Sequence, residues 1–146
     1  MSVIDSVGLF FLDTNILVYS FDHTAPDKQR VAQELIETAL STQRGLISTQ
    51  VVQEFLNVLL RKFQQPMAVA DAREYLHAVL LPLCQHFPSM VFYERALRIE
   101  QETGYSWYDA LIIAAAVETG CRVLFSEELQ AGQTMQGVTI VNPFRA

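Results

Sequence analysis

The sequence predicts an α/β domain whose mostly parallel sheet is covered by helices on both faces. Short apolar runs that suit buried strands alternate with longer segments whose apolar residues recur at helical spacing. Such βαβ units have right-handed crossovers, so the carboxyl ends of the strands lie along one rim of the sheet. Acidic residues also follow several of these strands or open the helices after them. The length suits one domain over residues 1–146 with a sizeable core.

The first predicted strand, Gly8–Leu12, is a short apolar run that stops abruptly at Asp13. Its aromatic residues suit a strand buried on both faces. In an open α/β sheet, ligands bind just beyond the carboxyl ends of the strands, so Asp13 is expected at a binding site. Further on, Thr24-Ala25-Pro26-Asp27 predicts the start of a helix, with a capping threonine and an acid three residues later. Gly45 is expected to break that helix.

The rest of the chain continues the alternation of strands and helices. After a helical turn at 16–21, the predicted elements are a strand at 46–48, helices at 49–63 and 69–83, a strand at 84–87, helices at 89–103 and 106–120, and strands at 122–125 and 138–141. A polar loop is expected over 127–137. The helix at 49–63 carries one polar stripe on an otherwise apolar surface, formed by Gln50, Gln53, Glu54, Asn57 and Arg61.

The net charge of −6 argues against a simple electrostatic nucleic-acid binder, which is normally basic. Two bound divalent cations would add +4 and change this charge to −2, which removes much of the objection. Eight of the ten basic residues are arginine, the side chain better suited to gripping phosphate with two hydrogen bonds. These basic residues are scattered along the chain, so they do not by themselves predict a basic patch.

The cysteines and the apolar runs predict a cytoplasmic protein. Cys84 and Cys121 are far apart and form no CxxC motif, so both thiols are expected to be reduced. The N-terminus lacks the basic region of a signal peptide, and its apolar run ends at Asp13. The longest strongly apolar helical run, 110–117, is too short to span a bilayer, so no membrane association is expected.

Acidic residues stand in four places at the expected rim. Asp13 follows the first strand, Glu54 lies in the helix after the second, Asp109 is in the first turn of the helix at 106–120, and Glu127 and Glu128 follow the strand at 122–125. Carboxylates that cluster without a cation repel one another and take up protons. Mg²⁺ prefers oxygen ligands and keeps some of its waters, so two to four carboxylates suit it. A cluster at the rim therefore predicts a metal site.

Each acid also has a purely structural interpretation. Asp13 could cap the turn that follows it, and Glu54 could belong to a solvated helix face. Ser106 and Asp109 have the spacing of a capping box, although a capped carboxylate keeps one oxygen free for another partner. Glu127 and Glu128 could be ordinary loop acids. The order of the four positions is stronger support for a site than any single residue.

Four motifs of this sequence resemble those of PIN domains, in the same order and over nearly the whole chain. Leu12-Asp13-Thr14-Asn15-Ile16-Leu17-Val18-Tyr19 resembles the opening motif of that family, and Gln53-Glu54-Phe55 the second. Trp107-Tyr108-Asp109-Ala110-Leu111-Ile112, followed by an alanine-rich helix, resembles the third. Leu124-Phe125-Ser126-Glu127-Glu128-Leu129-Gln130 resembles the fourth. The length is similar to that of the VapC-type toxins of bacterial toxin–antitoxin pairs.

The resemblance implies a three-layer α/β/α sandwich and a Mg²⁺- or Mn²⁺-dependent ribonuclease, often a homodimer, that is inhibited by a cognate antitoxin whose C-terminal segment enters the active-site groove. Asp13, Glu54 and Asp109 match the acidic positions of the family. Asp13 and Asp109 would hold the ion, while Glu54 and Glu128 would complete its shell, orient water or support a second ion. Asn15 and Ser126 match the polar supporting positions. RNA would be the substrate, cleaved by a metal-activated water attacking in line.

One position departs from the family pattern, because Glu128 stands where these proteins usually have Asp. This departure favours the alternative of a catalytically silent PIN fold that acts as a protein- or RNA-binding module. Two other phosphate-handling classes fit less well. A haloacid-dehalogenase-type phosphatase needs a second Asp where Asn15 stands, and a phospho-receiver domain needs an acid pair and a late lysine that the sequence lacks. No His–His pair is available for metal-free ribonuclease chemistry.

Overall fold

The computed structural model describes residues 8–145 and confirms the predicted α/β class. Six strands form one sheet in the order β3-β2-β1-β4-β6-β5, in which every neighbouring pair is parallel except β5 and β6. The strands are β1 (Phe10–Leu12), β2 (Gly45–Ser48), β3 (Cys84–His86), β4 (Val123–Phe125), β5 (Thr134–Met135) and β6 (Val138–Val141). The limits of the predicted domain, and part of the N-terminal segment expected not to be a signal peptide, lie outside the described residues.

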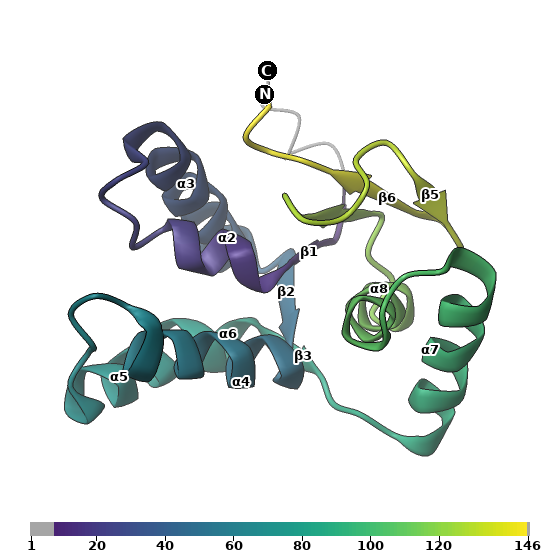
Figure 1. The fold of residues 1–146 in the computed structure, drawn as a ribbon, viewed down its shortest axis with the longest axis horizontal. Coiled ribbons are helices and arrows are strands. Elements are labelled where there is room, and N and C mark those ends of the chain that lie inside the picture. Colours follow the sequence, from purple (N-terminus) through teal and green to yellow (C-terminus); the bar gives the residue numbers. More distant parts are fainter. Residues whose placement is uncertain (1–7, 146) are drawn as a thin grey trace.

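Helices cover both faces of this sheet. Figure 1 shows α7 and α8 on one side and the helices from α2 to α6 on the other. Their bounds are α2 (Thr14–Tyr19), α3 (Pro26–Thr42), α4 (Thr49–Asn57), α5 (Val69–Tyr75), α6 (Leu81–Leu83), α7 (Met90–Thr103) and α8 (Trp107–Glu118), with π-helical segments η1 (Val58–Lys62) and η2 (Leu76–Leu80). In the described part of the chain, no helix combines the length and the apolar character needed to cross a membrane.

Strand β1 lies in the middle of the sheet and is fully buried. Its three residues have no solvent-exposed surface, which explains why a run of apolar residues without alternation forms this strand. It pairs with β2 on one side and β4 on the other. The backbone N–H of Asp13 donates to the carbonyl of Phe125, at 3.0 Å, and this bond continues the pairing with β4 by one residue. The end of β1 is thereby held beside the end of β4.

Two local predictions at the ends of α3 are wrong. The helix begins at Pro26 after Ala25, which provides no side-chain cap, and the hydroxyl of Thr24 donates to Asp22 instead. Proline is pre-organised for the first position of a helix and lacks the N–H that a cap would satisfy, so the threonine is not needed there. At the other end, the left-handed residue is Gln43, with φ of 59°, whereas Gly45 already belongs to β2.

Gly45 is required for a different reason, which is the close approach of α3 to β1 and β2. A Cβ atom at this position would lie 2.7 Å from the ring of Phe10 and 2.8 Å from Cα of Ala39. Real Cβ atoms almost never approach other heavy atoms that closely. The missing side chain therefore allows the last turns of α3 to pack directly on the strand.

The two long predicted helices are helical but not uniformly α-helical. The segment at 49–63 changes from α4 to the π-helical η1, where the N–H of Phe63 donates to the carbonyl of Val58 at 3.2 Å. The segment at 69–83 divides into α5, η2 and α6. The helical spacing of apolar residues in the sequence does not reveal a single π-helical turn, because one such turn changes that spacing too little. The predicted loop at 127–137 also contains β5, a strand too short to show an alternating pattern.

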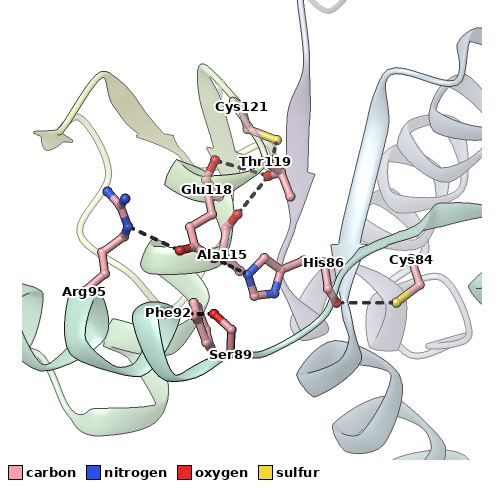
Figure 2. A network of polar contacts seen from close by, with 10 residues as sticks. Cys84, His86, Ser89, Phe92, Arg95, Ala115, Glu118, Thr119 and Cys121 are labelled. Atoms are coloured by element: carbon pink, nitrogen blue, oxygen red, sulfur yellow. Dashed lines mark hydrogen bonds and ion pairs between the residues drawn. The ribbon is translucent and has the colours of Figure 1, made fainter.

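A polar network joins β3 to the α7–α8 layer, as Figure 2 shows. His86 is buried, and its Nε2 donates to Oε1 of Glu118 at 2.9 Å. The Nε of Arg95 lies 3.5 Å from the other carboxylate oxygen of Glu118. The imidazole ring also packs against Phe92, with 4.4 Å between the ring centres. These contacts fix the edge strand against both helices of this layer.

We expect Gly45→Ala to lower the free energy of unfolding by about 1–3 kcal/mol, since the added methyl group overpacks a filled interior. Urea unfolding followed by circular dichroism measures this change. Ala39→Gly removes the Cβ atom of Ala39, which lies close to the position of the added methyl group. The double variant should therefore be less destabilised than the sum of the two single variants. Strict additivity would show that the contact between α3 and β2 is not the reason for glycine at position 45.

Candidate active site

The acids from all four predicted places line one cleft at the carboxyl ends of β1 and β4. The cleft has a volume of about 560 Å³, and its walls come from α2, α4, η1, the start of α8 and the loop after β4. Its carboxylates belong to Asp13, Asp22, Glu54, Asp109, Glu127 and Glu128. Residues far apart in sequence thus meet where the parallel-sheet argument placed them.

Asp13 forms the floor of the cleft and is almost completely buried. One carboxylate oxygen accepts the backbone N–H of Thr14 at 2.7 Å, so Asp13 also caps α2. The other oxygen accepts the hydroxyl of Ser126 at 2.7 Å and the side-chain amide of Asn15 at 3.2 Å. Asp13 thus caps α2 and also lines the cleft, so its capping role does not exclude a role in a site. The two predicted supporting residues are the ones that fix its carboxylate.

Ser126 organises the loop that follows β4. Its hydroxyl oxygen accepts the backbone N–H groups of Glu128 and Leu129, at 3.2 and 3.3 Å, while its proton is donated to Asp13. The side-chain oxygen of Asn15 accepts the backbone N–H of Glu127 at 3.1 Å. Because Ser126 is fully buried, this hydrogen-bond arrangement is protected from water. The loop that carries Glu127 and Glu128 is thereby attached to the end of β1.

Burial is the main reason that the pKa of Asp13 is raised, from 3.8 to about 6, and the negative charges of Glu128 and Glu54 raise it further. The hydrogen bonds from Ser126 and Thr14 act in the opposite direction but do not compensate. Burial also raises the pKa of Glu128, and the negative charges of Asp109, Glu54 and Glu127 raise it further. The charges of Glu54 and Glu128 thus act on Asp13, and those of Asp109 and Glu54 act on Glu128.

Glu54 is positioned by polar neighbours that the sequence interpretation did not single out. Its Oε1 accepts the hydroxyl of Thr14 at 3.3 Å and the side-chain amide of Gln50 at 3.0 Å. The same amide donates to the backbone carbonyl of Tyr108 at 3.2 Å, which joins α4 to the first turn of α8. The spacing of four residues between Gln50 and Glu54 could have indicated their contact. The contact with Tyr108 had no signal in the sequence.

Asp109 fulfils the helix-start prediction and also faces the cleft. Its backbone N–H donates to the hydroxyl of Ser106 at 3.4 Å, which makes Ser106 the N-cap of α8. The carboxylate of Asp109 is half-buried and lines the cleft. A carboxylate in the first turn is favoured by the helix dipole, so this position supports α8 and keeps a charge at the site.

The two adjacent glutamates have different surroundings. Glu127 accepts the hydroxyl of Tyr19 and pairs with the ammonium group of Lys28, both at 2.6 Å, and these contacts help to lower its pKa despite the opposing effect of burial. Lys28 also lies over the ring of Tyr19, 4.8 Å from its centre. Among the described residues, the Glu128 carboxylate forms no hydrogen bond or ion pair, and the negative charges of Asp109, Glu54 and Glu127 act on it. The two side chains therefore lie in different environments, and Tyr19 and Lys28 are partners of Glu127 that no sequence pattern revealed.

The chemistry of these donors fits a hard divalent cation, because the cleft contributes carboxylate oxygens and a cation would offset the raised pKa of Asp13. Within residues 8–145, however, no three His, Cys, Asp or Glu side chains are grouped closely enough to form a metal cluster. The acids share a cleft rather than a preformed cage. Mg²⁺ commonly keeps several waters and binds directly to only one or two carboxylates, so such an open arrangement remains compatible with it.

Comparison with known proteins places this geometry in a family context. The model of the PIN domain family matches residues 10–130. A toxin–antitoxin complex from Klebsiella pneumoniae is similar with a TM-score of 0.64 at 24% identity, over 91% of this chain and 96% of that chain. FitAcB from Neisseria gonorrhoeae has a TM-score of 0.64 at 17% identity, over 94% of this chain and 100% of that chain. VapC20 from Mycobacterium tuberculosis, a sarcin-ricin loop cleaving toxin, has a TM-score of 0.53 at 22% identity, over 82% of this chain and 91% of that chain. No curated protein matches the sequence.

For the metal-free protein, we expect the contribution of Asp13 to stability to fall as the pH rises. The folded state binds this proton more tightly than the unfolded chain, so the contribution is complete below about pH 4 and is lost as the pH rises through about 6. This rise in the pKa of Asp13 corresponds to a loss of about 3 kcal/mol in the free energy of unfolding. Urea unfolding in EDTA at several pH values measures it. Asp13→Asn should remove most of this loss, and parallel profiles for parent and variant would contradict the assignment.

Proposed function

The chain belongs to the PIN domain family, and on that basis we propose that it is a divalent-metal-dependent endoribonuclease, the toxin of a bacterial type II toxin–antitoxin pair. The observation that carries the proposal is the cleft in which a buried Asp13, fixed by Asn15 and Ser126, faces the carboxylates contributed by α4, α8 and the loop after β4. We infer that one domain over residues 1–146 performs this reaction in the cytoplasm.

In this proposal, each acid has a role that its position supports. Asp13 and Asp109 would hold the Mg²⁺ or Mn²⁺ ion, and Glu54 and Glu128 would complete its shell, orient water or support a second ion. A bound ion of this kind polarises the scissile phosphate of RNA and lowers the pKa of a water molecule for in-line attack. Ser126 would keep the floor carboxylate in one orientation. Because its hydroxyl donates to Asp13, the oxygens of Asp13 act only as acceptors and remain suited to a cation.

We further propose a cognate antitoxin and a homodimer as partners. The antitoxin proposal is supported by the similar solved structures, among which are a toxin–antitoxin complex and the VapBC2 complex from Rickettsia felis bound to promoter DNA. An antitoxin segment that enters the cleft would block the acids directly. The homodimer proposal is supported by large apolar side chains that are exposed around β3 and α7, namely Phe87, Met90, Val91 and Leu97.

The catalytically silent PIN fold remains the competing function, and Glu128 decides between the two. Glu128→Gln keeps the size of the side chain but removes its charge. We expect at least a tenfold to hundredfold loss of RNA cleavage in Mg²⁺ or Mn²⁺, since groups that support a metal commonly have effects of about this size. Glu127→Gln is the matched control, because its side chain faces Tyr19 and Lys28, and it should change the rate only a few-fold. Gel analysis of total RNA measures cleavage.

The remaining variants of this assay make the result decisive. Asp13→Asn should abolish cleavage, and the parent without divalent metal should leave the RNA intact. If the parent cleaves no RNA under any metal while Glu128→Asp does, the natural chain is a degenerate nuclease and the binding-module function is correct. Equal rates for the parent and both Glu128 variants would remove Glu128 from the active site without affecting Asp13, Glu54 or Asp109.

For the assembly, light scattering of the purified chain should give roughly twice the monomer mass of 16.5 kDa, as expected for a closed two-fold dimer. The measurement should cover concentrations from about 1 to 100 μM, because a weak dimer dissociates on dilution. A monomer across this range would refute the homodimer and leave the nuclease proposal unaffected.

A further inference from the structure

The negative charge of this cleft disfavours the binding of a polyanionic substrate. Six of the lining side chains are carboxylic acids, whereas only Lys62 is basic. RNA carries one negative charge per phosphate, and affinity for its backbone comes from neutralising these charges with Lys and Arg. A metal ion would act at the scissile phosphate alone. Contacts with neighbouring nucleotides therefore fall to the ten lining residues that are not acidic.

Lys62 has the position and the freedom to contact such a phosphate. It ends the π-helical segment η1 and lines the same wall as Asn57 and Val58. Its side chain is exposed, and within residues 8–145 it forms no hydrogen bond or ion pair. Lys28, by contrast, is paired with Glu127 at 2.6 Å. The ammonium group of Lys62 is thus available to pair with a negatively charged group of a bound ligand.

Tyr108 lines the cleft from the first turn of α8, and its aromatic ring is exposed. It is 65% exposed although it lines the cleft, and it immediately precedes Asp109. Among the described residues, its ring packs on no other aromatic ring, whereas the nearby Trp107 stacks on Tyr93. The backbone of Tyr108 is fixed, because its carbonyl accepts the side-chain amide of Gln50. Because this backbone is already fixed, less conformational entropy is lost when a base stacks on the exposed ring. The ring is therefore a suitable platform for a base.

We propose that Lys62 and Tyr108 hold single-stranded RNA in the acidic cleft, with Lys62 on a backbone phosphate and Tyr108 stacked on an unpaired base next to the scissile bond. Proteins that bind single strands combine basic groups along the backbone with aromatic side chains that accept any base. The placement of the scissile bond rests on the proposed nuclease function, but the RNA contacts themselves can be measured without cleavage. Both residues are therefore positioning groups for the substrate.

The test is fluorescence anisotropy of a labelled single-stranded RNA oligonucleotide, with every protein carrying Asp13→Asn so that the RNA stays intact. Tyr108→Ala should weaken binding about tenfold, and Tyr108→Phe should retain the affinity because it keeps the ring. Lys62→Gln should reduce the slope of log affinity against log salt concentration by about 0.7, the value for one lost phosphate contact on a single strand. Lys62→Arg should keep the slope.

Matched controls outside the cleft are Leu81→Ala, which removes most of an exposed apolar side chain, and Arg73→Gln, which removes an exposed cation. Both should bind RNA like the Asp13→Asn reference. The proposal is overturned if Tyr108→Ala binds like the reference, if Tyr108→Phe loses as much as Tyr108→Ala, or if Lys62→Gln leaves the salt slope unchanged. A failure of the nuclease proposal would appear separately, as intact RNA when the parent is incubated with Mg²⁺ or Mn²⁺.

Discussion

The hydrogen bond from Ser126 to Asp13 is the interaction on which the candidate site depends. It joins the residues that follow the two central strands, β1 and β4, inside the protein and away from water. The same hydroxyl oxygen accepts two backbone N–H groups, so the orientation of the loop after β4 and the orientation of the Asp13 carboxylate are set together. A serine is well suited to this place because it can donate one hydrogen bond and accept two. A change at either residue would therefore disturb both the floor and one wall of the cleft.

This arrangement has an energetic cost that the fold tolerates. A buried carboxylate with raised pKa works against the folded state at neutral pH, and nearby acids increase the effect. The offsetting contribution comes from the apolar strands below it, since β1 is completely buried and the interior of α8 consists largely of alanine and branched aliphatic residues. The molecule thus combines a well-packed interior with a cleft whose buried and neighbouring carboxylates are unfavourable for stability. This is expected where charged groups serve binding or chemistry.

The sequence predicted most of this arrangement because several features depend only on local spacing. The strand that ends at Asp13 and the capped start of α8 at Ser106 are short-range patterns, and both are found. The PIN family membership inferred from four motifs is confirmed. Other features depend on contacts between distant segments. The bond of Gln50 to the carbonyl of Tyr108 and the pairing of Lys28 with Glu127 join elements whose relative positions no local pattern contains. The prediction that Gly45 ends a helix was wrong, because Gly45 belongs to β2 and its missing side chain allows the close contact with Ala39.

The order of the strands has a consequence for association between molecules. Both edges of the sheet are poor templates for another strand. β5 has two residues, and β3 has three, with an irregular register against β2. Short or irregular edges are a known protection against edge-to-edge pairing, because they offer few aligned backbone N–H and C=O groups. These edges therefore disfavour the extension of one sheet across two copies of this chain. A specific assembly must instead be built from helix faces and side chains, which can be altered by substitution without disturbing the sheet that holds the acids.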